Sequence, residues 1–117
     1  MLDASVDHFP DWDEYQDWAA EGLLETAMIP GHPLVYPALG LAGEAGEYVD
    51  KVKKTVRDGL PENGQIEMAK ELGDVLWYLA VSAAHLGFKM SDIVDMNMQK
   101  LNARREAGLI QGSGDNR

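Results

Sequence analysis

The stretch from Leu39 to Asp74 reads LGLAGEAGEYVDKVKKTVRDGLPENGQIEMAKELGD. It contains two acidic pairs, Glu44 with Glu47 and Glu71 with Asp74, and both pairs have a spacing of three residues. Residues three apart on an α-helix are neighbours, with Cβ atoms about 5–6 Å apart. Each pair can therefore direct two carboxylates at one point, which is the arrangement that a hard divalent cation requires.

Apolar residues recur at three- and four-residue spacing on both sides of this stretch, a pattern typical of amphipathic helices. Asp11 is placed to cap the first helix, and the prolines and glycine of residues 30–33 stop it. Gly59 and Gly87 are placed to end the second and third helices, and Ser91 to cap the fourth. The sequence predicts an all-α fold with helices over residues 12–28, 37–58, 65–86 and 92–106.

The composition indicates one ordinary globular domain. The chain has 117 residues, no cysteine and a formal net charge of −10. The charge argues against binding to nucleic acid or anionic membranes, and the lack of cysteine excludes disulfides and thiolate metal sites. The longest uncharged apolar run, residues 75–88, is too short for a membrane span, and we expect a cytoplasmic protein. We expect a single helical domain over residues 1–108 and a flexible tail over 109–117.

The second half of the third expected helix indicates an oligomer. Residues 75–86 contain no Asp, Glu, Lys or Arg, and a helix that is apolar all round is buried on every side. One chain of this size cannot cover such a helix completely. We therefore expect part of Trp77, Tyr78, Val81 and Ala84 to pack against a second subunit in a dimer or tetramer.

Two antiparallel helices that present acidic pairs at one level would gather four carboxylates. At an effective dielectric constant of 20, each like-charge pair about 5 Å apart costs roughly 3 kcal/mol. Mg²⁺ or Mn²⁺ would offset this cost, because hard divalent ions bind carboxylate and water oxygens. Two such ions can activate water on one side of a phosphate and stabilise the leaving oxygen on the other. The pattern indicates phosphoanhydride or phosphodiester chemistry.

A simpler interpretation is a solvated acidic face, with Glu47 and Lys51 as an ordinary i,i+4 ion pair. Two features favour the metal site: Glu44 borders the apolar stripe of its helix, and the face of Asp74 continues into Trp77. A helical interaction module whose acidic face binds a basic partner stays open as an alternative of another class. It predicts no release of pyrophosphate from any nucleotide.

The fourth expected helix carries a polar row, Asn97, Lys100 and Arg104, on the same stripe as apolar residues. Such long cations can simply extend from a core stripe into solvent. The full row favours a phosphate clamp that faces the acidic cluster, in which Lys supplies a point charge and Arg a fork of donors. Asn97 is placed to reach a sugar. Three further candidate substrate contacts lie near the acidic pairs: Lys51, Lys54 and Trp77, the last as a possible stacking surface for a base.

Several other site types are excluded by the sequence. Di-iron and di-manganese bundles need Glu-x-x-His on two helices, and no glutamate here has a histidine three residues later. The three histidines are scattered, which argues against zinc. The chain has no P-loop, no glycine-rich dinucleotide turn and no arrangement typical of a catalytic triad.

Three separated motifs resemble the MazG-like all-α nucleoside triphosphate pyrophosphohydrolases. They are Glu44-x-x-Glu47, then Glu71-x-x-Asp74 after a gap of 23 residues, and Asn97-x-x-Lys100-Leu101-x-x-Arg104. The GSGDNR ending is similar to short, phage-type members. The resemblance covers residues 34–117, and the first helix matches only loosely.

The resemblance implies a four-helix bundle unit that dimerises, often into a tetramer. It implies hydrolysis of a nucleoside triphosphate, for which we favour a dNTP, to the monophosphate and pyrophosphate with two or three Mg²⁺ or Mn²⁺ ions. Metal-activated water would attack the α-phosphorus. A phosphoribosyl-ATP pyrophosphohydrolase or another nucleotide hydrolase of the superfamily is the alternative. The implied catalytic metal ligands are Glu44, Glu47, Glu71 and Asp74, and the implied sugar and phosphate contacts are Asn97, Lys100 and Arg104.

A closing movement of the C-terminal tail over bound nucleotide, with Asp115 or Arg117 contributing, is a further hypothesis.

Overall fold

The computed structural model describes residues 9–108, and the predicted tail with Asp115 and Arg117 lies outside this range. The described chain is all-helical, as predicted, apart from an isolated bridge between Ile29 and His32. None of its helices combines the length and apolarity needed to cross a membrane. The elements are α1 (Trp12–Glu21), a 3₁₀ turn (Glu25–Ala27), α2 (Val35–Asp58), α3 (Gly64–Leu86) and α4 (Met90–Glu106).

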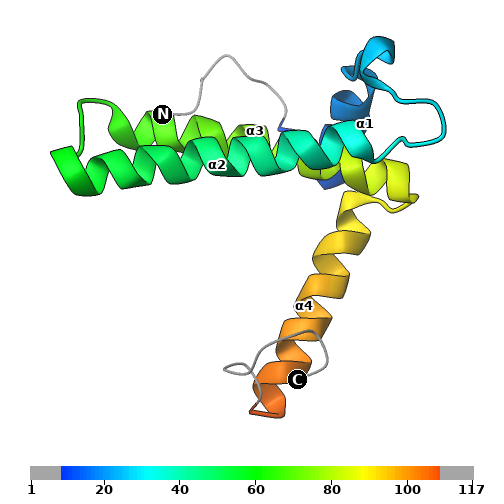
Figure 1. Ribbon diagram of the computed structural model, residues 1–117. Coiled ribbons are helices and arrows are strands. Elements are labelled where there is room, and N and C mark those ends of the chain that lie inside the picture. The colour runs from blue at the N-terminus through cyan, green and yellow to red at the C-terminus, as the bar shows by residue number, and fades with distance from the viewer. Residues whose placement is uncertain (1–8, 109–117) are drawn as a thin grey trace.

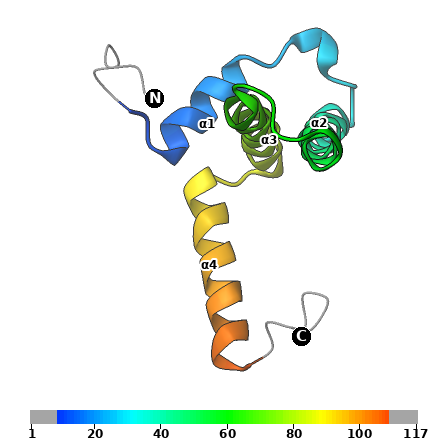
Figure 2. The same ribbon diagram turned by 90° about the vertical axis from the view of Figure 1, so that its left-hand side faces the viewer.

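Three of the helices form one layer, and the fourth projects from it. α2 and α3 are an antiparallel hairpin, and α1 packs against the C-terminal half of α3 (Figure 1). Viewed along the hairpin, α1, α3 and α2 lie side by side, whereas α4 extends away from them (Figure 2). A single chain therefore has the four predicted helices but does not close them into a bundle.

The core is small and lies where α1, α3 and the start of α4 meet. Its fully buried apolar residues are Ala19, Ala80, Val81, Ala83 and Met90. Val81 is completely buried by its own chain, so it is not among the residues of this group that can pack against a second subunit. The short side chains of the alanines let the three helices approach closely enough to cover it. Trp77, Tyr78 and Ala84 remain half-buried.

Four helix boundaries differ from the prediction: α2 and α3 begin slightly early, at Val35 and Gly64, and the end of α1 and the start of α4 differ as well. α1 ends at Glu21 rather than near residue 28, because the Gly22 N–H donates to the carbonyl of Ala19 and the Leu23 N–H to that of Ala20, which closes the last turn. α4 begins at Met90, and Ser91 is not its cap. The N-cap position is Lys89, and its backbone N–H donates to the side chain of Asp92 at 3.1 Å. The spacing of residues in the sequence did not indicate this cap.

The predicted caps of the other helices are confirmed. Asp11 caps α1 by accepting from the N–H groups of Asp13 at 3.1 Å and Glu14 at 2.8 Å. Gly59 and Gly87 end α2 and α3 with φ of 88° and 85°, backbone conformations that other residues rarely adopt.

The glycines at the start of α2 have different surroundings. A Cβ added at Gly40 would overlap the ring of Tyr78 on α3, so this glycine permits close packing of the two helices. Within residues 9–108, no atom lies within 4 Å of a Cβ built at Gly43 or Gly46. Gly40 is thus where α2 and α3 approach closely, and the other two glycines leave an open surface.

Two side chains of α1 hold the start of α4. Gln16 is 5% exposed, and its amide donates to the carbonyls of Ala80 at 3.2 Å and Phe88 at 2.9 Å while accepting from the N–H of Met90 at 3.0 Å. Asp13 accepts from the N–H of Ser91 at 2.9 Å and from its hydroxyl at 2.8 Å. The first turn of α4 is thus capped by another helix, and this contact determines the direction of α4.

Replacing Gln16 with Leu is expected to lower the free energy of unfolding by about 2–4 kcal/mol, because buried backbone groups lose their partners. Urea denaturation of the two proteins measures the difference. Gln99→Leu is the matched control, since Gln99 is exposed and its amide donates to Asp95 within the same helix. A loss in Gln16→Leu no larger than in the control would contradict this role for Gln16.

Candidate metal site

Packing of α2 against α3 brings three of the four predicted carboxylates together. Glu44, Glu71 and Asp74 each offer a ligand atom, and these atoms lie within 4.8 Å of one another. Glu44 and Glu71 are half-buried, and Asp74 is exposed. Three carboxylate oxygens from two rigid helices suit Mg²⁺ or Mn²⁺, which prefer hard oxygen ligands and keep open positions for water and phosphate.

The fourth carboxylate, Glu47, is exposed and lies outside this group. At about 100° per residue it is displaced about 60° around α2 from Glu44. It is still near enough for its charge to raise the pKa of Glu44. The structure therefore arranges three predicted ligands as a cluster and leaves the fourth at its edge.

Repulsion between the neighbouring carboxylates favours the binding of a cation at the cluster. Burial raises the pKa of Glu44, and the neighbouring charges of Asp74 and Glu71 raise it further. Burial, followed by the charge of Asp74, likewise raises the pKa of Tyr15 on α1. A positive ion among these groups would relieve the repulsion between the carboxylates.

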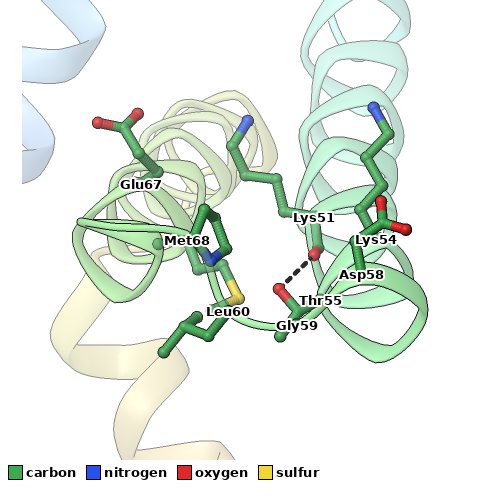
Figure 3. A pocket seen from close by; sticks show the side chains of 10 residues that line it. Lys51, Lys54, Thr55, Asp58, Gly59, Leu60, Glu67 and Met68 are labelled. Atoms are coloured by element: carbon green, nitrogen blue, oxygen red, sulfur yellow. Dashed lines mark hydrogen bonds between the residues drawn. The ribbon is translucent and has the colours of Figure 1, made fainter.

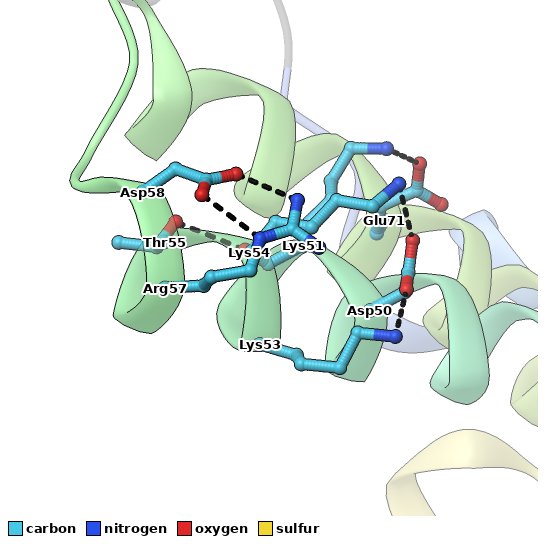
Figure 4. A network of polar contacts seen from close by, with 8 residues as sticks. All are labelled: Asp50, Lys51, Lys53, Lys54, Thr55, Arg57, Asp58 and Glu71. Atoms are coloured by element: carbon cyan, nitrogen blue, oxygen red, sulfur yellow. Dashed lines mark hydrogen bonds and ion pairs between the residues drawn. The ribbon is translucent and has the colours of Figure 1, made fainter.

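One cation of the protein already contacts the cluster. Lys51 donates to Glu71, with 2.9 Å between Nζ and Oε1 (Figure 4). This hydrogen bond lowers the pKa of Glu71 and raises the pKa of Lys51. The interpretation of Lys51 as an i,i+4 partner of Glu47 was wrong, because the flexible lysine reaches across the hairpin to α3 instead.

Lys54, the second predicted cation of α2, is engaged elsewhere. Its ammonium lies 2.8 Å from Asp50, which also pairs with Lys53 at 2.9 Å (Figure 4). These two lysines lower the pKa of Asp50 to about 2. Lys54 therefore belongs to an exposed ion-pair network on α2 rather than to the carboxylate cluster.

An aromatic cavity of about 370 Å³ adjoins the carboxylates. It is lined by Glu44, Asp74, Trp77 and Tyr78. The rings of Trp77 and Tyr78 meet edge to face with centroids 5.0 Å apart, and the Tyr36 ring lies 6.3 Å from that of Tyr78. Trp77 was predicted at this site. Tyr78 was missed, although its position four residues after Asp74 on one helix face was a usable signal.

A second cavity, also of about 370 Å³, lies at the turn that joins α2 and α3 (Figure 3). Lys51 and Lys54 line it together with Thr55, whose hydroxyl donates to the carbonyl of Lys51 at 2.9 Å. Its remaining lining residues are Asp58, Gly59, Leu60, Pro61, Gly64, Glu67 and Met68.

The predicted phosphate clamp does not face the carboxylates of its own chain. Asn97 and Lys100 line an open cavity of about 390 Å³ with Ile93 and Met96 on α4, whereas Arg104 is buried near the end of that helix. α4 points away from the α2–α3 hairpin (Figures 1 and 2). The clamp and the carboxylates of one chain therefore do not share a pocket, because the turn at Gly87 and the contacts of α1 set a divergent direction.

Comparisons with known proteins agree with this arrangement of helices and carboxylates. The model of the MazG nucleotide pyrophosphohydrolase domain matches residues 37–108, the region that holds all three motifs. The gene 37 protein of Mycobacterium phage L5 is 42% identical over 103 residues, which cover 80% of this chain and 90% of the relative. No solved structure gave a significant match. The chain belongs to the MazG nucleotide pyrophosphohydrolase domain family.

Proposed function

We propose that the protein hydrolyses a nucleoside triphosphate, with a dNTP as the favoured substrate, to the monophosphate and pyrophosphate. The observation that carries the proposal is the group of Glu44, Glu71 and Asp74, whose ligand atoms lie within 4.8 Å of one another beside an aromatic cavity. Family membership supports the reaction class.

The carboxylates would hold Mg²⁺ or Mn²⁺, with Glu47 at the edge of the group as the fourth ligand. Such an ion supplies Lewis acidity, which makes water more acidic and offsets the charge on phosphate oxygens. The two helices already hold the three carboxylates close together, so these ligands would need little rearrangement to bind the ion. Water then attacks the α-phosphorus, and pyrophosphate is the leaving group.

The base is proposed to occupy the aromatic cavity next to Glu44 and Asp74. Trp77 and Tyr78 line this cavity and offer π-faces and an apolar surface. Stacking on an aromatic side chain contributes about 1–3 kcal/mol per base. The cavity and the carboxylates share Glu44 and Asp74, so a nucleotide could place its base and its phosphates side by side.

The active unit is proposed to be a homodimer or homotetramer. Asn97 and Lys100 lie on α4, which points away from the carboxylates of the same chain. We therefore expect the phosphate clamp of each site to come from a second copy of the chain. The exposed apolar side chains of α2 support such an assembly, since Leu39, Val49 and Val56 are 68%, 61% and 83% exposed.

Pyrophosphate release from the four common dNTPs and four NTPs, with Mg²⁺ or Mn²⁺, tests the reaction. We expect release from at least one dNTP and none in the presence of a chelator. Phosphoribosyl-ATP is included in the substrate panel, because preferential turnover of that compound would identify the alternative enzyme. Absence of pyrophosphate with every substrate would favour the interaction module.

A further inference from the structure

We propose that Lys51 is an internal counter-ion of the carboxylate cluster, which neutralises Glu71 in the metal-free protein and is displaced when a divalent cation binds. This inference rests on the metal site of the proposed function. In this role Lys51 acts on Glu71 before the metal ion binds, and it does not need to contact the substrate.

The environment of the Lys51–Glu71 pair distinguishes it from the other ion pairs of α2. The side chains of Lys51 and Glu71 are 34% and 16% exposed, whereas those of Lys53 and Lys54 are 68% and 57% exposed. Ion pairs that are shielded from solvent are screened less by water and salt. The Lys51 ammonium therefore compensates the cluster more effectively than any lysine that merely lies on the same helix.

The ammonium and a divalent ion compete for the same carboxylate. Glu71 is bonded to Lys51, and it is also one of the three carboxylates whose ligand atoms lie within 4.8 Å of one another. An ion bound by these atoms would place two further positive charges close to the ammonium. Because like charges at this range repel strongly in a partly shielded site, the ion and the bonded lysine exclude each other.

The structure also provides space for the displaced side chain. Lys51 borders the cavity of about 370 Å³ at the α2–α3 turn (Figure 3). Its flexible four-carbon stem can therefore turn away from Glu71 without a backbone shift. Once released, the ammonium carries a positive charge beside the site at which phosphates would bind.

Titration calorimetry of the full chain with Mn²⁺ or Mg²⁺ alone, without nucleotide, tests the exchange. Lys51→Met is expected to bind the ion about three- to tenfold more tightly than wild type, because no ammonium has to be displaced. Lys53→Met is the matched control, since it removes the same charge from the same helix but contacts Asp50 instead. Its affinity is expected to stay within about twofold of wild type.

Two further measurements keep the test decisive. Lys51→Arg, which retains the charge and can still donate to Glu71, is expected to bind the ion no more tightly than wild type. If Lys51→Met is too unstable to titrate, Lys51→Gln takes its place with the same expected direction. In a chelator, Lys51→Met is expected to melt at a lower temperature than Lys53→Met, because the cluster has lost its counter-ion.

An unchanged or weaker ion affinity in Lys51→Met, relative to Lys53→Met, would overturn the inference while leaving the metal site in place. If wild type itself binds neither ion, the metal site of the proposed function fails and the inference fails with it. Pyrophosphate release by wild type, measured separately, keeps the two results distinguishable.

Discussion

Asp74→Asn is expected to lower kcat/KM for the preferred nucleotide by about 10³-fold. The substitution removes one of the three clustered carboxylates, and loss of metal-ion stabilisation is worth several kcal/mol, at about 1.4 kcal/mol for each factor of ten. Because Asp74 is exposed, the fold should survive the change. Steady-state pyrophosphate release measures the activity, and circular dichroism measures the retained helicity.

The control for this variant is Asp17→Asn, which makes the same chemical change at an exposed position on α1. It is expected to keep wild-type turnover. Near-wild-type kinetics in Asp74→Asn, with the metal still required, would show that Asp74 is not a ligand and would end the assignment of the site.

Mg²⁺ is expected to raise the melting temperature of the wild-type protein by about 10–20 °C at saturating concentration. An ion that binds only the folded state at 100 times its Kd contributes about 2.7 kcal/mol. For a domain of this size each kcal/mol corresponds to about 4–8 °C. Thermal melts with and without a chelator give the shift, and a melt indifferent to millimolar Mg²⁺ would count against a preformed site.

Thermal melts of Glu44→Gln should separate the stability of the metal-free fold from the stabilisation that Mg²⁺ adds. Burial and the charges of Asp74 and Glu71 raise the pKa of Glu44, so its ionised form is disfavoured in the metal-free fold. A neutral amide removes this repulsion, and the variant should melt a few degrees higher than wild type in a chelator. It should also lose most of the Mg²⁺-dependent shift. Glu21→Gln, at an exposed position on α1, should behave as wild type in both conditions.

The parts of the structure that local spacing determines could be predicted from the sequence. The acidic pairs lie on two neighbouring helices as expected, because a three-residue spacing fixes which side chains share a helix face. Gly59 and Gly87 end their helices because few other residues adopt positive φ. These features depend on chain geometry within one or two turns.

Features that depend on contacts between helices were harder to predict. The simpler interpretation paired Lys51 with Glu47, four residues earlier, but the hydrogen bond of Lys51 goes to Glu71 across the hairpin. The divergence of α4 depends on Gln16 and Asp13, which lie 74 and 78 residues from their partners in α4. No local pattern marks such bonds, so the direction of α4 could not be predicted from the sequence.

In the described part of the chain, α1 is hydrogen-bonded to α4 at the N-terminal end of α4. Lys100 lies ten residues beyond Met90, which corresponds to about 15 Å along a helix. A tilt of about 10° at the attachment would therefore move Lys100 by about 2–3 Å, comparable to the length of one hydrogen bond. Substitutions around Gln16 and Asp13 are therefore expected to shift the position of Lys100, although they lie far from it.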